Sequence, residues 1–462
     1  MRELEGQLDH ALATIAKLET RIAELEDRLR ANSSNSSRAP SSDPAWAPRF
    51  TPKKPTGRPP GGRKGHPGHC RELLPPDRVD AVVEHRPRRC ARCGRPLPAD
   101  APAELRARRQ VAELPPRAVR VTEHRAYACR CAACGASTVE PIPPEVRASC
   151  TGPRLAAALC YLSGRVRGSR RAVGEVAAEV FGCPLSLGSV ANREAEMAAA
   201  LAGPCERVQR HVRSAPAKNV DETGWRRAGR WLWTAATQAA ALFRIGRGRN
   251  WHALQDLLGR DVFGTVCSDR HGLYNHLKAG RRAVCWAHLQ RDFMRWRERG
   301  GPTGRLGAGG LKVTGEVFRL WHRFRVGKVT RRRLRRLLAP LRRRLRALLT
   351  WGATRDPSAG RRGAGVKASH FCRNLLALEP ALWTFARLKG IEPTNNHAER
   401  MLRPGVMWRK TSFGSHSDGG CRYAERILTA VQTLRLQHRR VVDYLADALD
   451  AHRRGTAPPK LI

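Results

Sequence analysis

Two short cysteine pairs constrain the fold of this 462-residue chain more than any other feature. Each pair has the pattern Cys-x-x-Cys-Gly, and the four cysteines are Cys90, Cys93, Cys131 and Cys134. The glycine allows the tight turn that directs both sulfur atoms of a pair at one ion. Four thiolates make a closed tetrahedral site, so the pattern predicts a structural Zn²⁺ that holds a small domain together. Cys129 is the alternative to Cys131 as a ligand.

The chain is also strongly basic. Lysine and arginine number 86 against 40 aspartates and glutamates, which gives a formal charge of +46. A field of this strength attracts polyanions, of which nucleic acid is the commonest, and it argues against a small-molecule metabolic enzyme. Arginine far outnumbers lysine, as a GC-rich coding bias would produce, so the sign of the charge is more informative than its size.

Targeting signals and disulfide patterns are both missing from the sequence. No segment approaches the roughly 18 apolar residues of a membrane-spanning helix, and the N-terminus lacks the apolar core of an export signal. The 14 cysteines are spread along the chain rather than packed as a disulfide framework. We therefore expect a reduced, cytoplasmic protein with no membrane partner.

Residues 1–30 carry the seven-residue repeat of a coiled coil. The two core positions of the repeat are occupied by Leu8, Ile15, Ile22 and Leu29 and by Leu4, Ala11, Leu18 and Leu25. Isoleucine at the first position with leucine at the second favours a parallel dimer, so we expect a homodimer or a higher oligomer. The alternative is a single amphipathic helix that packs on its own chain.

Residues 31–77 are rich in proline, glycine, serine and basic side chains and cannot build a core. An arginine next to proline and glycine is slim enough to lie in the minor groove of DNA. Arg58, Arg63 and Lys64 are therefore candidate DNA contacts, with a plain flexible linker as the alternative.

The next segments predict a small β-domain followed by helices. Short strands are expected at 79–83 and 119–127. Helices are expected at 155–162, 172–181 and 187–201, and Ser186 is the predicted N-cap of the third. Their arrangement is similar to a helix-turn-helix, although any small helical bundle has the same pattern.

From residue 216 the pattern becomes mixed α/β. Three strands, a helix at 251–258 and two further strands are predicted over 219–286, which is the element order of a ribonuclease-H-like sheet. Arginine-rich helices with leucine at helical spacing follow over 301–389. Their cationic face either is solvated or contacts phosphate.

Three dispersed acids stand at the ends of predicted elements. Asp221 lies at the end of the first strand, Asp269 ends the fourth, and Glu399 lies on the second turn of a helix that Thr394 is expected to cap. Three such carboxylates can hold two Mg²⁺ ions about 3.5–4 Å apart for displacement at phosphorus. The structural alternatives are an N-cap role for Asp221, an Asp269–Arg270 ion pair and a Glu399–Arg403 ion pair.

Seven motifs, in order over roughly residues 32–435, resemble the insertion-sequence 66 family of bacterial transposases. They are Asn35-Ser36-Ser37 with Pro40-Ser41-Ser42-Asp43, Gly65-His66-Pro67-Gly68-His69, the two cysteine pairs, Val220-Asp221-Glu222-Thr223-Gly224-Trp225, Asp269 with Tyr274, Cys285-Trp286-Ala287-His288, and Asn395-Asn396-His397-Ala398-Glu399-Arg400 with Leu402-Arg403-Pro404 and Arg409-Lys410-Thr411-Ser412-Phe413-Gly414-Ser415. The resemblance implies a DDE transposase on a ribonuclease-H-like fold that cuts and joins DNA with Mg²⁺ or Mn²⁺. It places the DDE acids on Asp221, Asp269 and Glu399.

Two details depart from the family pattern or leave a choice open. Arg270-His271 follow Asp269 where the family usually has Gly-Tyr. Glu222 is a second candidate ligand beside Asp221, but adjacent strand residues point to opposite faces, so only one can face the metals.

Basic and histidine side chains near these acids are candidates for contacting DNA. His288 is expected to donate a hydrogen bond near the scissile phosphate, with a satisfied core histidine as the alternative, and a Cys285–His288 metal pair is disfavoured because two ligands do not close a site. A phosphate track is expected at Arg400, Arg403, Arg409 and Lys410, each of which is otherwise a surface cation.

The predicted fold class is α/β, with a ribonuclease-H-like mixed sheet and a helical insertion behind a coiled coil, a small zinc-ribbon-like domain and a helical domain. The expected segments are a dimerising coiled coil at 1–30, a basic linker at 31–77, a zinc-binding domain at 78–145, a helical domain at 146–215, the first part of the catalytic core at 216–300, an Arg-rich helical insertion at 301–389, the closing part of the core at 390–440, and a C-terminal helix and tail at 441–462.

We therefore expect a nucleoid-associated bacterial transposase that binds the terminal repeats of a mobile element, cleaves them and joins them to target DNA. Accessory proteins of the same element are further candidate partners. The alternative is a non-catalytic, zinc-containing DNA-binding protein derived from such an enzyme. An RNA-binding structural protein is disfavoured, because aromatic residues make up only 6% of the chain.

Overall fold

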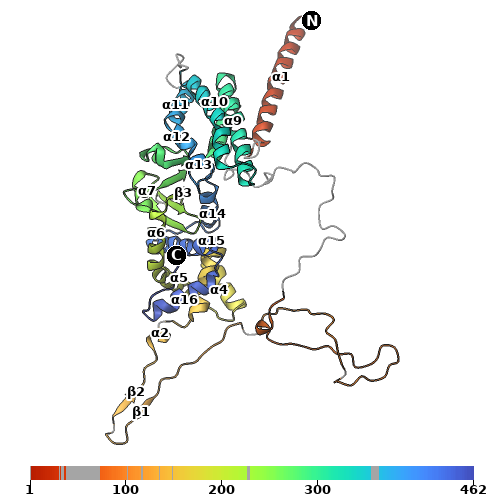
Figure 1. Ribbon diagram of the computed structural model, residues 1–462, viewed down its shortest axis with the longest axis vertical. Helices are drawn as coiled ribbons and strands as arrows, with labels where there is room; N and C mark the ends of the chain where they lie inside the picture. Colours follow the sequence, from red (N-terminus) through yellow and green to blue (C-terminus); the bar gives the residue numbers. More distant parts are fainter. Residues whose placement is uncertain are drawn as a thin grey trace. The chain divides into compact units, whose positions relative to one another are not determined.

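The computed structural model describes residues 2–30, 32, 36–37, 73–100, 102–115, 118–134, 136–147, 149–225, 229–354 and 364–462 (Figure 1). The chain divides into two compact units, Thr51–Arg120 and the rest, Met1–Phe50 with Val121–Ile462. Three candidate DNA contacts of the basic linker, Arg58, Arg63 and Lys64, lie outside the described residues.

The predicted N-terminal helix is confirmed as α1 (Arg2–Arg30). Its described large apolar side chains are between 44% and 66% exposed, and they are Leu12, Ile15, Leu18, Ile22, Leu25 and Leu29. The stripe that carries most of the predicted coiled-coil core is therefore available to a partner helix, while the pairing itself stays a prediction.

The strands predicted at 79–83 and 119–127 are wrong. In the smaller unit the described residues form the short helix η2 (Pro76–Arg78) and an isolated bridge between Arg89 and Pro96. The first regular strands are β1 (Ala128–Arg130) and β2 (Ser137–Val139), which pair antiparallel. Valines at 82, 83 and 121 are at least 74% exposed, so β-branched side chains alone did not produce strands where no apolar surface covers them.

A set of helices precedes the large sheet. Its members are α2 (Pro144–Arg147), α3 (Pro153–Tyr161), the π-helical turn η3 (Leu162–Val166), α4 (Arg170–Glu179), α5 (Leu187–Ala200) and α6 (Ala202–Ser214). The predicted cap of α5 is confirmed, because the Ser186 side chain accepts a hydrogen bond from the Ser189 N–H.

A five-stranded mixed sheet follows, in the predicted order of elements. Its members are β3 (Ala217–Gly224), β4 (Arg230–Ala236), β5 (Ala241–Arg247), helix α7 (Trp251–Leu258), β6 (Thr265–Ser268), the short helices η4 (Gly272–His276) and η5 (Ala279–Arg281), and β7 (Arg282–Val284). The spatial order is β5-β4-β3-β6-β7, with β3, β4 and β5 antiparallel and β6 and β7 parallel to β3. The prediction of a mixed α/β core is therefore confirmed.

Helices occupy the rest of the chain. They are α8 (Trp286–Glu298), α9 (Gly301–Arg325), α10 (Arg331–Thr354), α11 (Ala364–Ala377), α12 (Glu379–Leu382), α13 (Thr384–Arg387), α14 (Asn396–Ser412), α15 (Asp418–Leu436) and α16 (Val441–Arg453). Leucines bury one face of α10, as predicted, while most of its arginines remain exposed. Figure 1 shows the sheet between the helices of 301–389 and those of 144–214. None of the described helices is long and apolar enough to cross a membrane.

The free edge of β5 is covered by α15. The backbone N–H groups of Ala241, Phe243 and Ile245 donate to the side chains of Thr433, Thr429 and Glu425, respectively, at 2.6–3.2 Å. Acceptors four residues apart on a helix match donors two residues apart on a strand, because both repeats advance by about 6 Å. Side chains of α15 thus supply acceptors that a neighbouring strand would otherwise provide.

Replacing Thr429 with valine is expected to lower the free energy of unfolding by about 1–3 kcal/mol. Valine keeps the shape but removes the acceptor, which leaves the buried Phe243 N–H unsatisfied. The midpoint of urea unfolding measures the change. Thr411→Val is the control. Among the described residues that exposed hydroxyl donates only to Met407 O in its own helix, so its loss should cost less than about 0.5 kcal/mol.

Candidate active site

Asp221 lies in the second half of β3, opposite Thr234 of β4, and so it is not a helix N-cap. Side chains alternate along a strand, so Asp221 shares a face with Asn219. Asn219 Nδ2 donates to Asn395 Oδ1 at 2.9 Å, and this contact identifies the face as the one covered by the start of α14. Asp221 therefore points toward the helix that carries Glu399.

Asn395 fixes the start of α14 against the sheet. Its Nδ2 donates to Val220 O at 2.7 Å, and its backbone N–H donates to Cys285 Sγ at 3.2 Å. The predicted capping role of Thr394 is wrong, because Asn395 is the N-cap residue and its side chain binds β3 instead of α14. Glu399 consequently lies in the first turn of α14 rather than the second.

Asp269 directly follows β6, the parallel neighbour of β3, so the two aspartates lie toward the same ends of adjacent strands. Asp269 Oδ1 accepts the His271 N–H at 2.9 Å, and Oδ2 is 3.4 Å from Arg249 Nη2. The alternative Asp269–Arg270 ion pair is absent, because Arg270 binds Asp292 at 3.1 Å.

The neighbouring acids affect the ionisation of Asp221. Burial raises the pKa of Asp221 well above its ordinary value of 3.8, and the charges of Glu222, Glu399 and Asp269 raise it further. Glu399 and Asp269 come from elements far apart in the sequence, and both contribute negative charge at Asp221. A carboxylate cluster of this kind is the environment in which a bound cation offsets repulsion.

Glu222 points to the opposite face from Asp221. Its carboxylate is held by Arg249, at 2.6 Å, and by the hydroxyl of buried Tyr274. Burial raises the pKa of Glu222, as does the charge of Asp269. Of the two adjacent acids, Asp221 is thus the one that faces α14.

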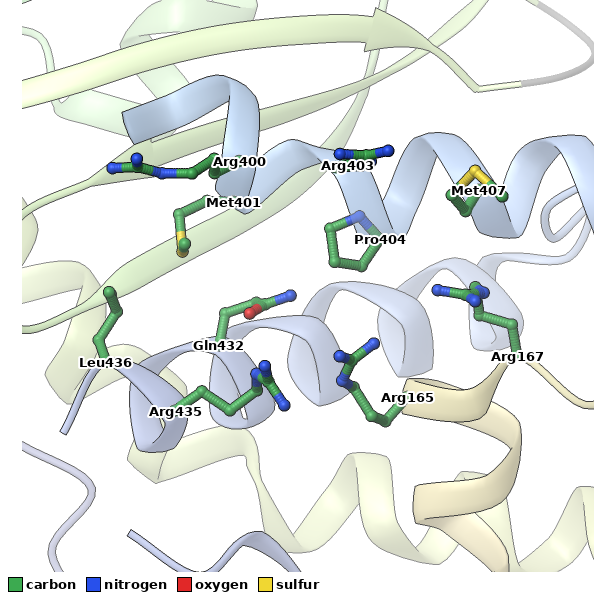
Figure 2. A pocket seen from close by; sticks show the side chains of 10 residues that line it. All are labelled: Arg165, Arg167, Arg400, Met401, Arg403, Pro404, Met407, Gln432, Arg435 and Leu436. Atoms are coloured by element: carbon green, nitrogen blue, oxygen red, sulfur yellow. The ribbon is translucent and has the colours of Figure 1, made fainter. Parts of the chain in front are cut away.

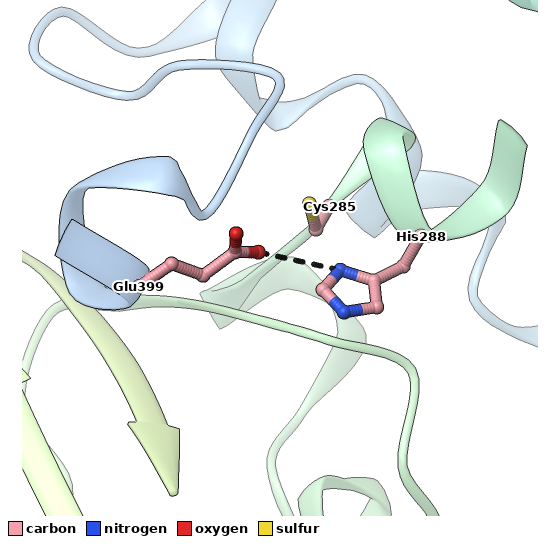
Figure 3. A group of neighbouring side chains, drawn as sticks. All are labelled: Cys285, His288 and Glu399. Atoms are coloured by element: carbon pink, nitrogen blue, oxygen red, sulfur yellow. Dashed lines mark ion pairs between the residues drawn. The ribbon is translucent and has the colours of Figure 1, made fainter. Parts of the chain in front are cut away.

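His288 of α8 lies against Glu399, with 3.8 Å between Nδ1 and Oε1 (Figure 3). Both atoms are buried, and neither has a hydrogen-bond partner among the described residues. Burial lowers the pKa of His288, so the imidazole is neutral near pH 7. The alternative Glu399–Arg403 ion pair is not found between these two described side chains. Two neighbouring buried polar atoms without partners are the kind of site that a water molecule or an ion satisfies.

Cys285 completes a group with His288 and Glu399 whose potential ligand atoms lie within 4.8 Å of one another. Burial raises the pKa of the Cys285 thiol to about 11, which disfavours the thiolate that a soft metal requires. Its sulfur also accepts the Asn395 N–H. These facts favour a structural role for Cys285.

The donor set at this site fits a hard divalent cation. Asp221, Asp269 and Glu399 supply oxygen atoms, which Mg²⁺ prefers, and Glu399 Oε1 is buried without a partner among the described residues. The repulsion that raises the pKa of Asp221 would be relieved by positive charge.

Each cysteine pair has the same local geometry within its own turn. The backbone N–H of Cys93 lowers the pKa of Cys90, and that of Cys134 lowers the pKa of Cys131. A lowered thiol pKa favours the thiolate that binds Zn²⁺. The chemistry of Cys90 and Cys131 therefore fits the predicted metal.

Of the four residues of the predicted phosphate track, three do not bind the end of β3 and one does. Arg400 and Arg403 line a cavity beside α14, and Lys410 is exposed. Arg409 donates to Thr223 Oγ1 at 3.0 Å and to Gly224 O at 2.6 Å, so it holds the end of β3.

Sequence patterns did not identify Arg249 or Asn395 as functional residues. Arg249 contacts two acids from a loop before α7, and Asn395 joins α14 to β3. The motif that contains Asn395 predicts roles for Glu399 and Arg400 but none for Asn395 itself.

Comparison with known families gives three matches. A model of the IS66 transposase family matches residues 165–423, which is more than half of the chain and includes the three acids and His288. The zinc-finger binding domain of IS66 transposases matches 87–135 and contains all four cysteines, which supports Zn²⁺ binding. A family of unknown function (DUF6444) matches 1–72, and no curated protein matches the chain. The chain belongs to the IS66 family of transposases.

Proposed function

We propose that this chain is a DDE transposase that cleaves the ends of a mobile DNA element and joins them to target DNA with Mg²⁺. The observation that carries the proposal is geometric: Asp221 and Asp269 lie toward the same ends of the adjacent strands β3 and β6, and Asn395 joins the start of the helix that carries Glu399 to β3. The sheet order β5-β4-β3-β6-β7, with its parallel and antiparallel pairs, supports a ribonuclease-H-like core. The family match supports a DNA-processing enzyme.

The protein's own groups would position the reactants. Asp221, Asp269 and Glu399 would hold two Mg²⁺ ions. The bound ions would lower the pKa of an attacking water or 3′-hydroxyl and stabilise the leaving oxygen. Asn395 would keep Glu399 in register with β3, and Arg249 would orient Asp269. Neutral His288 would donate a hydrogen bond to a phosphate oxygen beside Glu399.

We propose that two copies of the chain pair through α1 and that this dimer brings two DNA ends together. The exposed apolar stripe of α1 supports this assignment. Two catalytic units held together would process two ends of one element.

The test uses the full-length protein with DNA that carries the ends of its own element and Mg²⁺. New 3′-hydroxyl strands and joined products are the expected result. Binding of the same DNA without any Mg²⁺-dependent product would favour the non-catalytic DNA-binding alternative.

Replacing His288 with alanine is expected to lower the cleavage rate about 10²-fold, the usual effect of losing one donor to a reacting oxyanion. DNA affinity should change little, because one neutral donor contributes little to phosphate binding. Rate and affinity measured on the same end DNA separate the two effects. His252→Ala on the exposed side of α7 is the control. A fall in melting temperature without a selective fall in rate would instead make His288 a core residue.

A further inference from the structure

A cavity of about 600 Å³ lies between α14, α15 and the turn η3 (Figure 2). Five of the residues that line it are arginines, and none of its described lining residues is acidic; the arginines are Arg165, Arg167, Arg400, Arg403 and Arg435. Figure 2 shows Arg400 and Arg403 on one wall and Arg165 and Arg435 on the other. We call this space the arginine cavity.

The part of the chain that the structure describes does not neutralise the guanidinium groups of the arginine cavity. None of the five forms an ion pair with a carboxylate in the described part of the chain. Arg165 Nε is buried and has no hydrogen-bond partner among those residues. Burial lowers the pKa of Arg165, and the charges of Arg435 and Arg167 lower it further, so these cations repel one another.

The fold holds these repelling charges together through contacts behind them. At Gly164 a β-carbon would lie 2.5 Å from Ile427 Cγ1, so only glycine allows η3 to approach α15 this closely. The Ser163 hydroxyl lies 2.6 Å from the Tyr423 hydroxyl, and both side chains are buried. These contacts fix the turn that presents Arg165.

Arg167 has a backbone conformation that suits glycine. Its φ is 67°, and its carbonyl accepts a hydrogen bond from Ser412 Oγ at 3.2 Å. A side chain in this left-handed region strains the backbone, and such strain is often kept where the side chain has a function. An arginine at this position puts a cation into the cavity at the expense of local stability.

We propose that the arginine cavity binds the backbone phosphates of a DNA strand next to Glu399, an assignment that rests on the proposed function. Arg400 and Arg403 lie one and four residues after Glu399 on the same helix. The wall from Arg400 to Met407 rises about 10 Å along α14. Phosphates of one strand advance by about 3.4 Å each along the axis of duplex DNA, so a wall that lies along that axis spans about three of them.

The test compares the double variant Arg165→Gln/Arg435→Gln with wild type by fluorescence anisotropy on a labelled DNA duplex over a range of KCl concentrations, in EDTA. Each lost phosphate contact should reduce the slope of log affinity against log salt by about 0.9. The double variant should therefore lose roughly 2 from the slope, and roughly 60-fold in affinity at 0.1 M salt. The melting temperature should stay the same or rise, because repulsion is removed.

Arg260→Gln/Arg281→Gln is the matched control, since it removes the same charge from an exposed region before β6 and β7, at the opposite strand ends from Asp269. An equal loss in the control would overturn the proposal, because the cavity would then contribute only net charge. An unchanged slope in the cavity variant would also overturn the proposal. So would a rise in the melting temperature of wild type with inorganic phosphate that leaves the affinity for DNA unchanged. Catalysis does not occur in EDTA, so a failure here leaves the DDE assignment untouched.

Discussion

Asp221→Asn protein should bind element-end DNA normally and lose strand cleavage by at least about 10³-fold. Asparagine keeps the size of the side chain but removes the charge that a divalent cation needs. A loss of 10³-fold corresponds to about 4 kcal/mol of transition-state stabilisation, within the range that metal catalysis supplies. Asp269→Asn and Glu399→Gln should have similar effects. Production of 3′-hydroxyl strands from labelled end DNA with Mg²⁺ measures them.

Glu222→Gln is the informative control for Asp221→Asn, because the two acids are adjacent in sequence and point to opposite faces of β3. Glu222 is bound by Arg249 and Tyr274. Its substitution should therefore lower the melting temperature clearly and have only a small effect on the rate of metal-dependent cleavage. Cleavage that survives in Asp221→Asn and disappears in Glu222→Gln would reverse the assignment of the two acids.

The same Asp221 substitution should stabilise the metal-free protein at neutral pH. The folded protein raises the pKa of Asp221, so it binds that proton more tightly than the unfolded chain does. A group of this kind favours folding at low pH and costs stability as pH rises through its folded pKa. The difference in melting temperature between Asp221→Asn and wild type in EDTA should therefore be small at acid pH and largest near neutrality. Active sites commonly carry such a cost.

Local signals in the sequence were enough for many elements of the fold. Helix α7 begins and ends where its apolar spacing predicted, at Trp251 and Leu258, and α5 begins after its serine cap. Caps and helical periodicity act within a few residues, so a single sequence contains them. The strands expected at 79–83 failed for the opposite reason, because a strand requires a partner that composition does not specify.

The candidate site required information that is not local. The acids could be named from motifs, but the contact that joins the start of the Glu399 helix to β3 is made by the Asn395 side chain with Val220, 175 residues away in sequence. The local rule favoured Thr394 as a cap, and the tertiary contact of Asn395 prevailed. The arginine cavity was equally hidden, because Arg165 and Arg435 meet only when η3 packs on α15.

Cys90→Ser and Cys131→Ser proteins should each lose the bound zinc that wild type carries. Structural zinc in finger peptides contributes about 10–16 kcal/mol, so the region matched by the zinc-finger family should lose its fold with the metal. Zinc content per chain measures the first effect, and protease cleavage within 87–135 measures the second.

Cys129→Ser decides which thiols form the ligand set. The Cys90 N–H donates to the carbonyl five residues later, at 2.9 Å, and the Cys131 N–H does the same, at 2.8 Å. Cys129 instead lies within β1, opposite Thr138. Cys131 is thus the structural equivalent of Cys90, and Cys129→Ser should keep its zinc. Loss of zinc from Cys129→Ser, with retention in Cys131→Ser, would show that the second pair binds the metal through Cys129 and Cys134.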